Sequence, residues 1–178
     1  MMRSIIFAVG LSLVAASTQA AVLIAMDLPA LVEQSDLIVV ASAQKQSSRY
    51  VNKLIVTDVT LNVSSTLKGS TKPGEPVVVT HLGGAVGDVG LNVPGAASFR
   101  IGESAVVFLR RVPSGEWNVT GMSQGIMKIT GQEVVPGGSG AELMERDQEG
   151  RLVDLKKPAA PRVLPDLLSE IRRLVADR

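Results

Sequence analysis

The chain has 178 residues, with 18 basic side chains, 17 acidic side chains and no cysteine. This near-balance of charge gives no indication of a nucleic-acid or anionic-membrane partner, each of which favours a basic surface. The absence of cysteine excludes disulfides, thiolate metal sites, a thiol nucleophile and a lipid-modified N-terminal cysteine. The hydrophobic core must therefore hold the fold together.

The first 20 residues have the pattern of a secretory signal peptide. Arg3 gives a positive start, an uncharged apolar run covers 5–16, and small and polar residues occupy 17–20. The apolar run has about a dozen residues, whereas a bilayer span needs roughly 20. Loss of Arg3 by cleavage between Ala20 and Ala21 leaves 17 basic and 17 acidic residues. The pattern predicts export, to the periplasm or the medium, without a transmembrane span after signal removal.

The first part of the remaining chain predicts one short helix and two strands. Residues 27–35 predict the helix, with Asp27 as its N-cap. The β-branched run over 37–41 predicts a buried strand, and the polar stretch over 44–52 predicts a turn. Residues 53–67 predict a long strand with one wet face, and a phase shift between Val56 and Val59 predicts a bulge near Thr57 and Asp58.

The later segments alternate between short strands and stretches rich in glycine or proline. Strands are predicted over 77–80, 105–110, 117–120 and 125–130, and a hairpin over 143–153. Loops are predicted over 68–74, 81–97 and 134–141, a proline-rich linker over 156–164, and an amphipathic helix over 165–178. Residues 21–155 thus predict a mainly β domain, a small antiparallel OB-like barrel with a β-sandwich as the alternative.

Several of these segments resemble an uncharacterised family of exported bacterial β-barrel proteins. The similar pieces are Ser35–Ala43, Val59–Gly69, Gly83-Gly84, Val93–Gly95 with Phe99 and Gly102-Glu103, Val107–Leu109, and Gly121–Gly125. The match covers residues 27–153. The family's glycine after its first strand is replaced here by Ser42.

The first half also resembles, more distantly, the netrin-like domains and the tissue inhibitors of metalloproteinases. The carrying pieces are the strand over 37–41 and the later Lys68-Gly69. This resemblance implies a five-stranded OB-type barrel. Those inhibitors bind the protease zinc through an N-terminal cysteine, and this chain has none. Their inhibitory chemistry therefore does not carry over.

The sequence offers no convincing catalytic set. His81 is the single histidine, and a metal site needs about three ligands or more, so we predict neither metal nor cofactor. Residues 121–125 spell Gly-x-Ser-x-Gly, but the nucleophile elbow requires a strand-to-helix turn in an α/β sheet. A serine hydrolase using Ser123 and His81 is kept as an alternative.

The glycine-rich stretch after the third strand is the candidate binding region. His81, Gly83, Gly84, Asp88 and Asn92 are the predicted binding residues, because glycine lets backbone groups approach a ligand closely. The leading hypothesis is an exported, non-enzymatic protein that binds a protein of the envelope or medium, for example a protease, and no nucleic acid. A second alternative is a structural envelope protein that assembles through its C-terminal helix.

Overall fold

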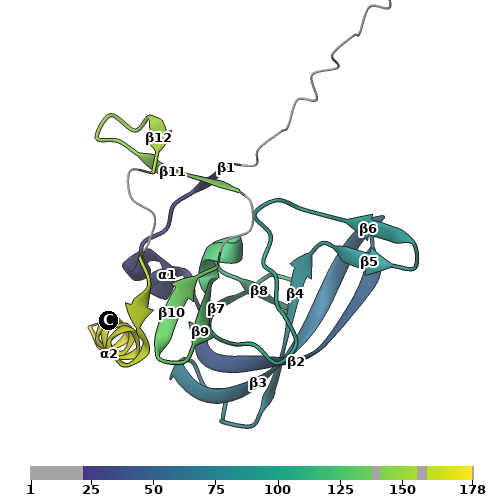
Figure 1. The fold of residues 1–178 in the computed structure, drawn as a ribbon, viewed down its shortest axis with the longest axis horizontal. Helices are drawn as coiled ribbons and strands as arrows, with labels where there is room; N and C mark the ends of the chain where they lie inside the picture. The colour runs from purple at the N-terminus through teal and green to yellow at the C-terminus, as the bar shows by residue number, and fades with distance from the viewer. Residues whose placement is uncertain (1–21, 138–140, 156–159, 178) are drawn as a thin grey trace, which may run out of the picture.

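A computed structural model describes residues 22–137, 141–155 and 160–177, so the predicted signal peptide over 1–20 lies outside the described residues. The protein is mainly β, with one α-helix near each end of the described chain (Figure 1). The elements in chain order are β1 (Val22–Ile24), α1 (Leu28–Gln34), β2 (Leu37–Val51), β3 (Leu54–Lys68), β4 (Pro76–Leu82), β5 (Gly84–Val86), β6 (Val89–Leu91), β7 (Ser104–Arg111), β8 (Trp117–Val119), the 3₁₀ turn η1 (Met122–Gly125), β9 (Ile126–Thr130), β10 (Glu133–Pro136), β11 (Glu142–Arg146), β12 (Leu152–Asp154), β13 (Arg162–Val163) and α2 (Leu164–Ala176).

Five of the strands close into a barrel. β2, β3 and β4 form an antiparallel meander, β7 pairs with β2, and β8 pairs both with β7 and, in parallel, with β4. The order β2-β3-β4-β8-β7 therefore returns to β2, and β9, β10 and β13 extend the same sheet beyond β7. Five strands in such a closed arrangement form an OB-like barrel, and the predicted fold class is confirmed.

The hairpin of β2 and β3 is longer than the sequence suggested. Each strand has 15 residues, and the predicted turn over 44–52 is wrong, since β2 continues to Val51. The chain reverses instead at Asn52 and Lys53, which both have positive φ. Most of residues 44–51 are exposed, which is why polar side chains are tolerated there. Pairing with β3, in which apolar and polar side chains alternate, keeps the segment extended.

The predicted bulge near Thr57 and Asp58 is also wrong. The register is regular there, and Thr57 is buried in line with Ile55 and Val59 on the inner face of β3. Because Thr57 is a polar residue on the inner face, it interrupts the apolar alternation and gave the false impression of a phase shift. One of the real irregularities lies in β2, where Gln44 has no partner between Ala43 and Lys45.

Two hydrophobic clusters stabilise the fold. The first fills the barrel interior with alternate residues of β2, β3, β4 and β7, including Val39, Val59 and Val107. The second covers the outer face of β2 and β7 with the two helices, and Leu167 and Ile171 of α2 are fully buried in it. The apolar stripe of α2 is thus packed within the molecule. No helix among the described residues is long and apolar enough to cross a membrane.

The remaining strands depart from the predictions in detail. β1 was not predicted and pairs in parallel with β11 in a separate three-stranded sheet. The predicted hairpin over 143–153 is confirmed as β11 and β12. β10 lies in a stretch predicted as a glycine-rich loop, and α2 begins one residue before the predicted 165. The predicted linker over 156–164 lies partly outside the described residues, and its described part contains β13.

Candidate functional site

The β5–β6 hairpin lies beside the outer part of the β2–β3 hairpin (Figure 1). A groove of about 680 Å³ is lined there by residues of these hairpins, of the end of β4 and of the loop after β6. Its position follows from the inward face of the barrel, which is apolar over most of β3 but carries Thr57 near the tip. The described residues that line it include no Asp, Glu, Lys or Arg. They are Gln46, Ser48, Thr57, His81, Leu82, Gly83, Gly84, Ala85, Leu91, Asn92, Val93, Ala96, Ala97, Ser98 and Phe99.

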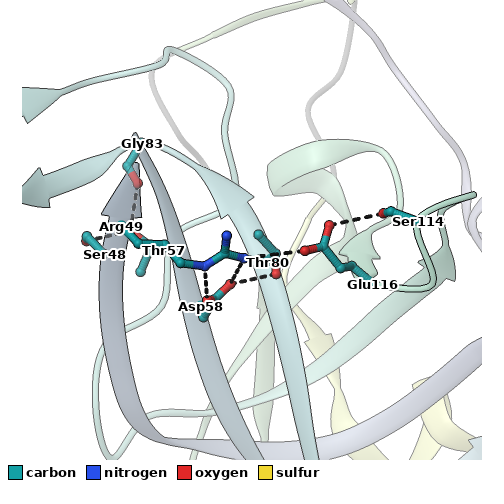
Figure 2. Close-up of polar contacts among 8 residues, drawn as sticks. All are labelled: Ser48, Arg49, Thr57, Asp58, Thr80, Gly83, Ser114 and Glu116. Carbon is teal, nitrogen blue, oxygen red and sulfur yellow. Dashed lines mark hydrogen bonds and ion pairs between the residues drawn. The ribbon is translucent and has the colours of Figure 1, made fainter. Parts of the chain in front are cut away.

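Two glycines bring backbone against the hydroxyl groups of this groove. Thr57 Oγ1 donates to the Gly83 carbonyl at 2.6 Å, and Ser48 Oγ lies 2.8 Å from Thr57 Oγ1 (Figure 2). A hydroxyl has one proton, so Ser48 is the donor to Thr57. A Cβ on Gly84, whose φ is +127°, would lie only 2.2 Å from Thr57 Oγ1. Gly84 is therefore required by both backbone conformation and space.

His81 contributes the aromatic wall of the groove. It lies opposite Thr57 in the β3–β4 register, and its ring centroid is 6.1 Å from that of Phe99. Its Nδ1 lies 2.9 Å from the Leu82 carbonyl oxygen. A carbonyl only accepts, so Nδ1 carries a proton in this contact.

The outer face of the same strands carries a charged network that was not predicted from the sequence. Arg49 Nε donates to Asp58 Oδ2 at 2.6 Å and its Nη2 reaches Glu116 at 3.3 Å, while the Thr80 hydroxyl also donates to Asp58 (Figure 2). The hydrogen bond from Arg49 is the largest cause that lowers the pKa of Asp58, and the same bond raises the pKa of Arg49. The network ties β2, β3 and β4 to the turn before β8.

Four of the five predicted binding residues lie in the groove. His81, Gly83, Gly84 and Asn92 line it, whereas Asp88 is exposed in the turn between β5 and β6 and does not. Eleven further lining residues were not predicted as binding residues. Three of them come from strands far from the glycine stretch: Gln46, Ser48 and Thr57. The sequence did indicate Thr57, because it is a polar residue among the apolar residues that occupy the inward positions of β3.

Ser123 and His81 belong to different parts of the structure. Ser123 is buried in η1, between β8 and β9, where its backbone N–H donates to the Gly95 carbonyl at 3.1 Å. It does not line the groove that holds His81. The Gly-x-Ser-x-Gly string therefore forms a 3₁₀ turn between strands. Within the described ranges, no three His, Asp or Glu side chains are grouped as a metal site would require.

The protein is thus an OB-like barrel with a groove, lined by no acidic or basic side chain among the described residues, beside the β2–β3 hairpin. No protein-family model matches the chain, and no curated protein matches it significantly. The resemblances drawn from the sequence patterns stay predictions.

Proposed function

We propose that this chain is an exported, non-enzymatic binding protein whose partner is a protein of the cell envelope or the surrounding medium. The observation that carries the proposal is the groove, which combines hydroxyl, amide and backbone groups with a complete lack of charged lining side chains. Such a surface can form many short-range hydrogen bonds without the desolvation cost of a buried charge.

Exposed apolar side chains around the groove favour a protein as the ligand. Tyr50 and Leu54 at the hairpin tip, Leu82 at the end of β4 and Val89 in β6 are all at least 43% exposed. Single exposed apolar residues are ordinary, but these four belong to the elements that bound one groove. An apolar rim around a polar centre suits a protein surface better than a small hydrophilic solute.

The geometry favours binding over catalysis. The His81 ring packs near Phe99 and its Nδ1 is engaged with a backbone carbonyl, so no carboxylate orients it in the manner of a general base. The hydrolase alternative also needs a nucleophile within hydrogen-bond reach of His81, and Ser123 is outside the groove lining.

Export rests on the signal-peptide pattern and on the resemblance to exported bacterial β-barrel proteins. It is tested by N-terminal sequencing of the protein recovered from the periplasm or medium. A chain beginning at Ala21 is expected, and an unprocessed chain retained in the cytoplasm would contradict export.

The binding function is tested by a pull-down from the native envelope and medium, with the processed protein as bait. The matched baits are Ser98→Arg, which places a charge in the groove, and Ser70→Arg, which places one in the exposed loop before β4. One stoichiometric protein partner, retained by Ser70→Arg and lost by Ser98→Arg, is expected. Equal capture by both variants, or no partner with any folded bait, would contradict the proposal. A protease among the partners would justify an inhibition assay.

A further inference from the structure

Among the described residues, one edge of β2 has no paired strand beside the groove. β2 pairs with β7 only over residues 37–42, although its pairing with β3 continues to Val51. Ala43 makes the last bonds on the β7 side, donating to the Glu103 carbonyl at 3.1 Å and accepting from Gly102 N–H at 2.8 Å. Beyond it, no strand or loop of the described residues forms a backbone hydrogen bond with the stretch 44–51 on that side.

The register identifies the backbone groups that this edge presents. The Ile55 carbonyl accepts from Gly83 N–H, so the peptide groups of Ile55 point toward β4 and away from β2. In an antiparallel ladder its partner Tyr50 must then point its own N–H and C=O away from β3. Backbone groups of every second residue point to the same side of a strand, so those of Ser48 and Gln46 also point away from β3. Tyr50, Ser48 and Gln46 therefore present free backbone N–H and C=O groups at this edge.

The same residues connect the edge to the groove. The side chains of Gln46 and Ser48 line the groove together with the loop residues Ala96 to Phe99. A segment placed along β2 would therefore send every second side chain into the groove. Uncharged side chains are favoured there, because the lining has no charged group to pair with an ionised one.

The outer face of β2 beside this edge presents one basic side chain, Lys45, that has no ion pair among the described residues. Lys45 and Arg49 lie on the outer face of β2, where they pair with Thr60 and Val56 of β3. Arg49 is held by Asp58 and Glu116, whereas Lys45 is exposed and forms no ion pair within the described part of the chain. The outward side chains of an added strand would face this charge, so acidic residues are favoured there.

We propose that residues 44–51 of β2 capture an extended segment of the partner protein by β-strand addition. Neutral side chains of that segment enter the groove, and acidic side chains alternate with them beside Lys45. The inference rests on the proposed binding function and names how the partner is recognised. A second copy of this chain is a poor occupant, since its own Lys45 would add a second cation to the edge where an acidic side chain is favoured.

The probe is a phage-displayed library of random twelve-residue peptides, panned on the protein obtained from the full-length chain. Enriched peptides are expected to alternate acidic and neutral residues. Synthetic versions are then N-methylated at one position at a time. Methylation at every second position should weaken binding about 3- to 10-fold, because it removes one backbone hydrogen bond to β2, and methylation between them should have little effect. Equal sensitivity at all positions would overturn strand addition.

The protein side of the test uses Lys45→Glu, with Lys72→Glu in the exposed loop before β4 as its control. Binding of the enriched acidic peptides should fall with the first variant alone, and equal loss with both would contradict the assigned edge. The enriched peptide must also displace the partner captured in the pull-down. A partner captured but not displaced would overturn strand addition and leave the proposed function standing, whereas capture of no partner would defeat the proposed function itself.

Discussion

The Gly84→Ala substitution should be among the most damaging single-methyl changes in the protein. Gly84 has φ of +127°, and a Cβ there would lie 2.2 Å from Thr57 Oγ1 and 2.4 Å from Ser48 Oγ. Real Cβ atoms do not approach so closely, so either the hydroxyls or the β5 backbone must move. Movement would break the chain of hydrogen bonds from Ser48 through Thr57 to the Gly83 carbonyl.

The magnitude follows from two contributions. Backbone strain at such a φ costs about 1–3 kcal/mol for a residue with a side chain. The two hydrogen bonds are worth about 0.5–1.5 kcal/mol each. Together they predict a loss of about 4 kcal/mol in the free energy of unfolding, which lowers Tm by roughly 8–16 °C in a chain of this size.

Gly87→Ala is the matched control. Gly87 also has a positive φ, +59°, in the turn of the same hairpin, but a Cβ added there would meet nothing within 4 Å. We expect about 1 kcal/mol for its strain alone. Thermal and urea unfolding, followed by circular dichroism, would measure both variants. Equal destabilisation by the two substitutions, or a Gly84→Ala loss below about 1 kcal/mol, would refute the close packing inferred at Ser48 and Thr57.

Three further predictions concern other parts of the fold. Asp58→Asn should cost about 1 kcal/mol at pH 7, given the partial exposure of the Arg49 pair. Because folding lowers the pKa of Asp58, its contribution is present above the ordinary aspartate value of about 3.9 and is lost as pH falls through the lower folded value, so wild type and variant should converge in acid denaturation curves. Ile171→Ala should cost about 2–5 kcal/mol, since Ile171 is fully buried, whereas exposed Arg172→Ala should change the unfolding free energy by less than about 0.5 kcal/mol in the same urea titrations. Ser35→Ala should cost about 1–3 kcal/mol, because the buried Thr120 hydroxyl loses the Ser35 partner at 2.9 Å, and a Thr120→Val, Ser35→Ala double variant should cost less than the sum in a double-mutant cycle.

The class of fold could be predicted from the sequence because alternation is a local property. β3 and β7 alternate or run apolar in a way that identifies them as strands, and Asp27 does cap α1 through Ala30 N–H. The ends of the strands were harder to predict from the sequence. The polar stretch over 44–51 has the composition of a turn, and only its partner β3, with the reversal at Asn52 and Lys53, makes it a strand.

The site could be predicted only in part, because it is assembled from distant segments. The glycine stretch pointed to His81, Gly83 and Gly84, since density of glycine is visible locally. Ser48 enters the groove because the unpaired Gln44 changes which residues of β2 face inward, and an extra residue of this kind has no sequence signature. β1 was missed because three residues carry too little periodicity, and its partner β11 is more than a hundred residues away.

That long-range pairing has a consequence for the order of folding. Val22 to Ile24 pair as a strand with Glu142 to Met144, so β1 can form only after all the strands of the barrel have emerged. Closing so large a loop is slow compared with forming the β2–β3 hairpin. With the proposed export, the stretch next to the predicted cleavage point would stay unpaired, and accessible to a peptidase, through most of translocation. β1 would be among the last strands to find its place.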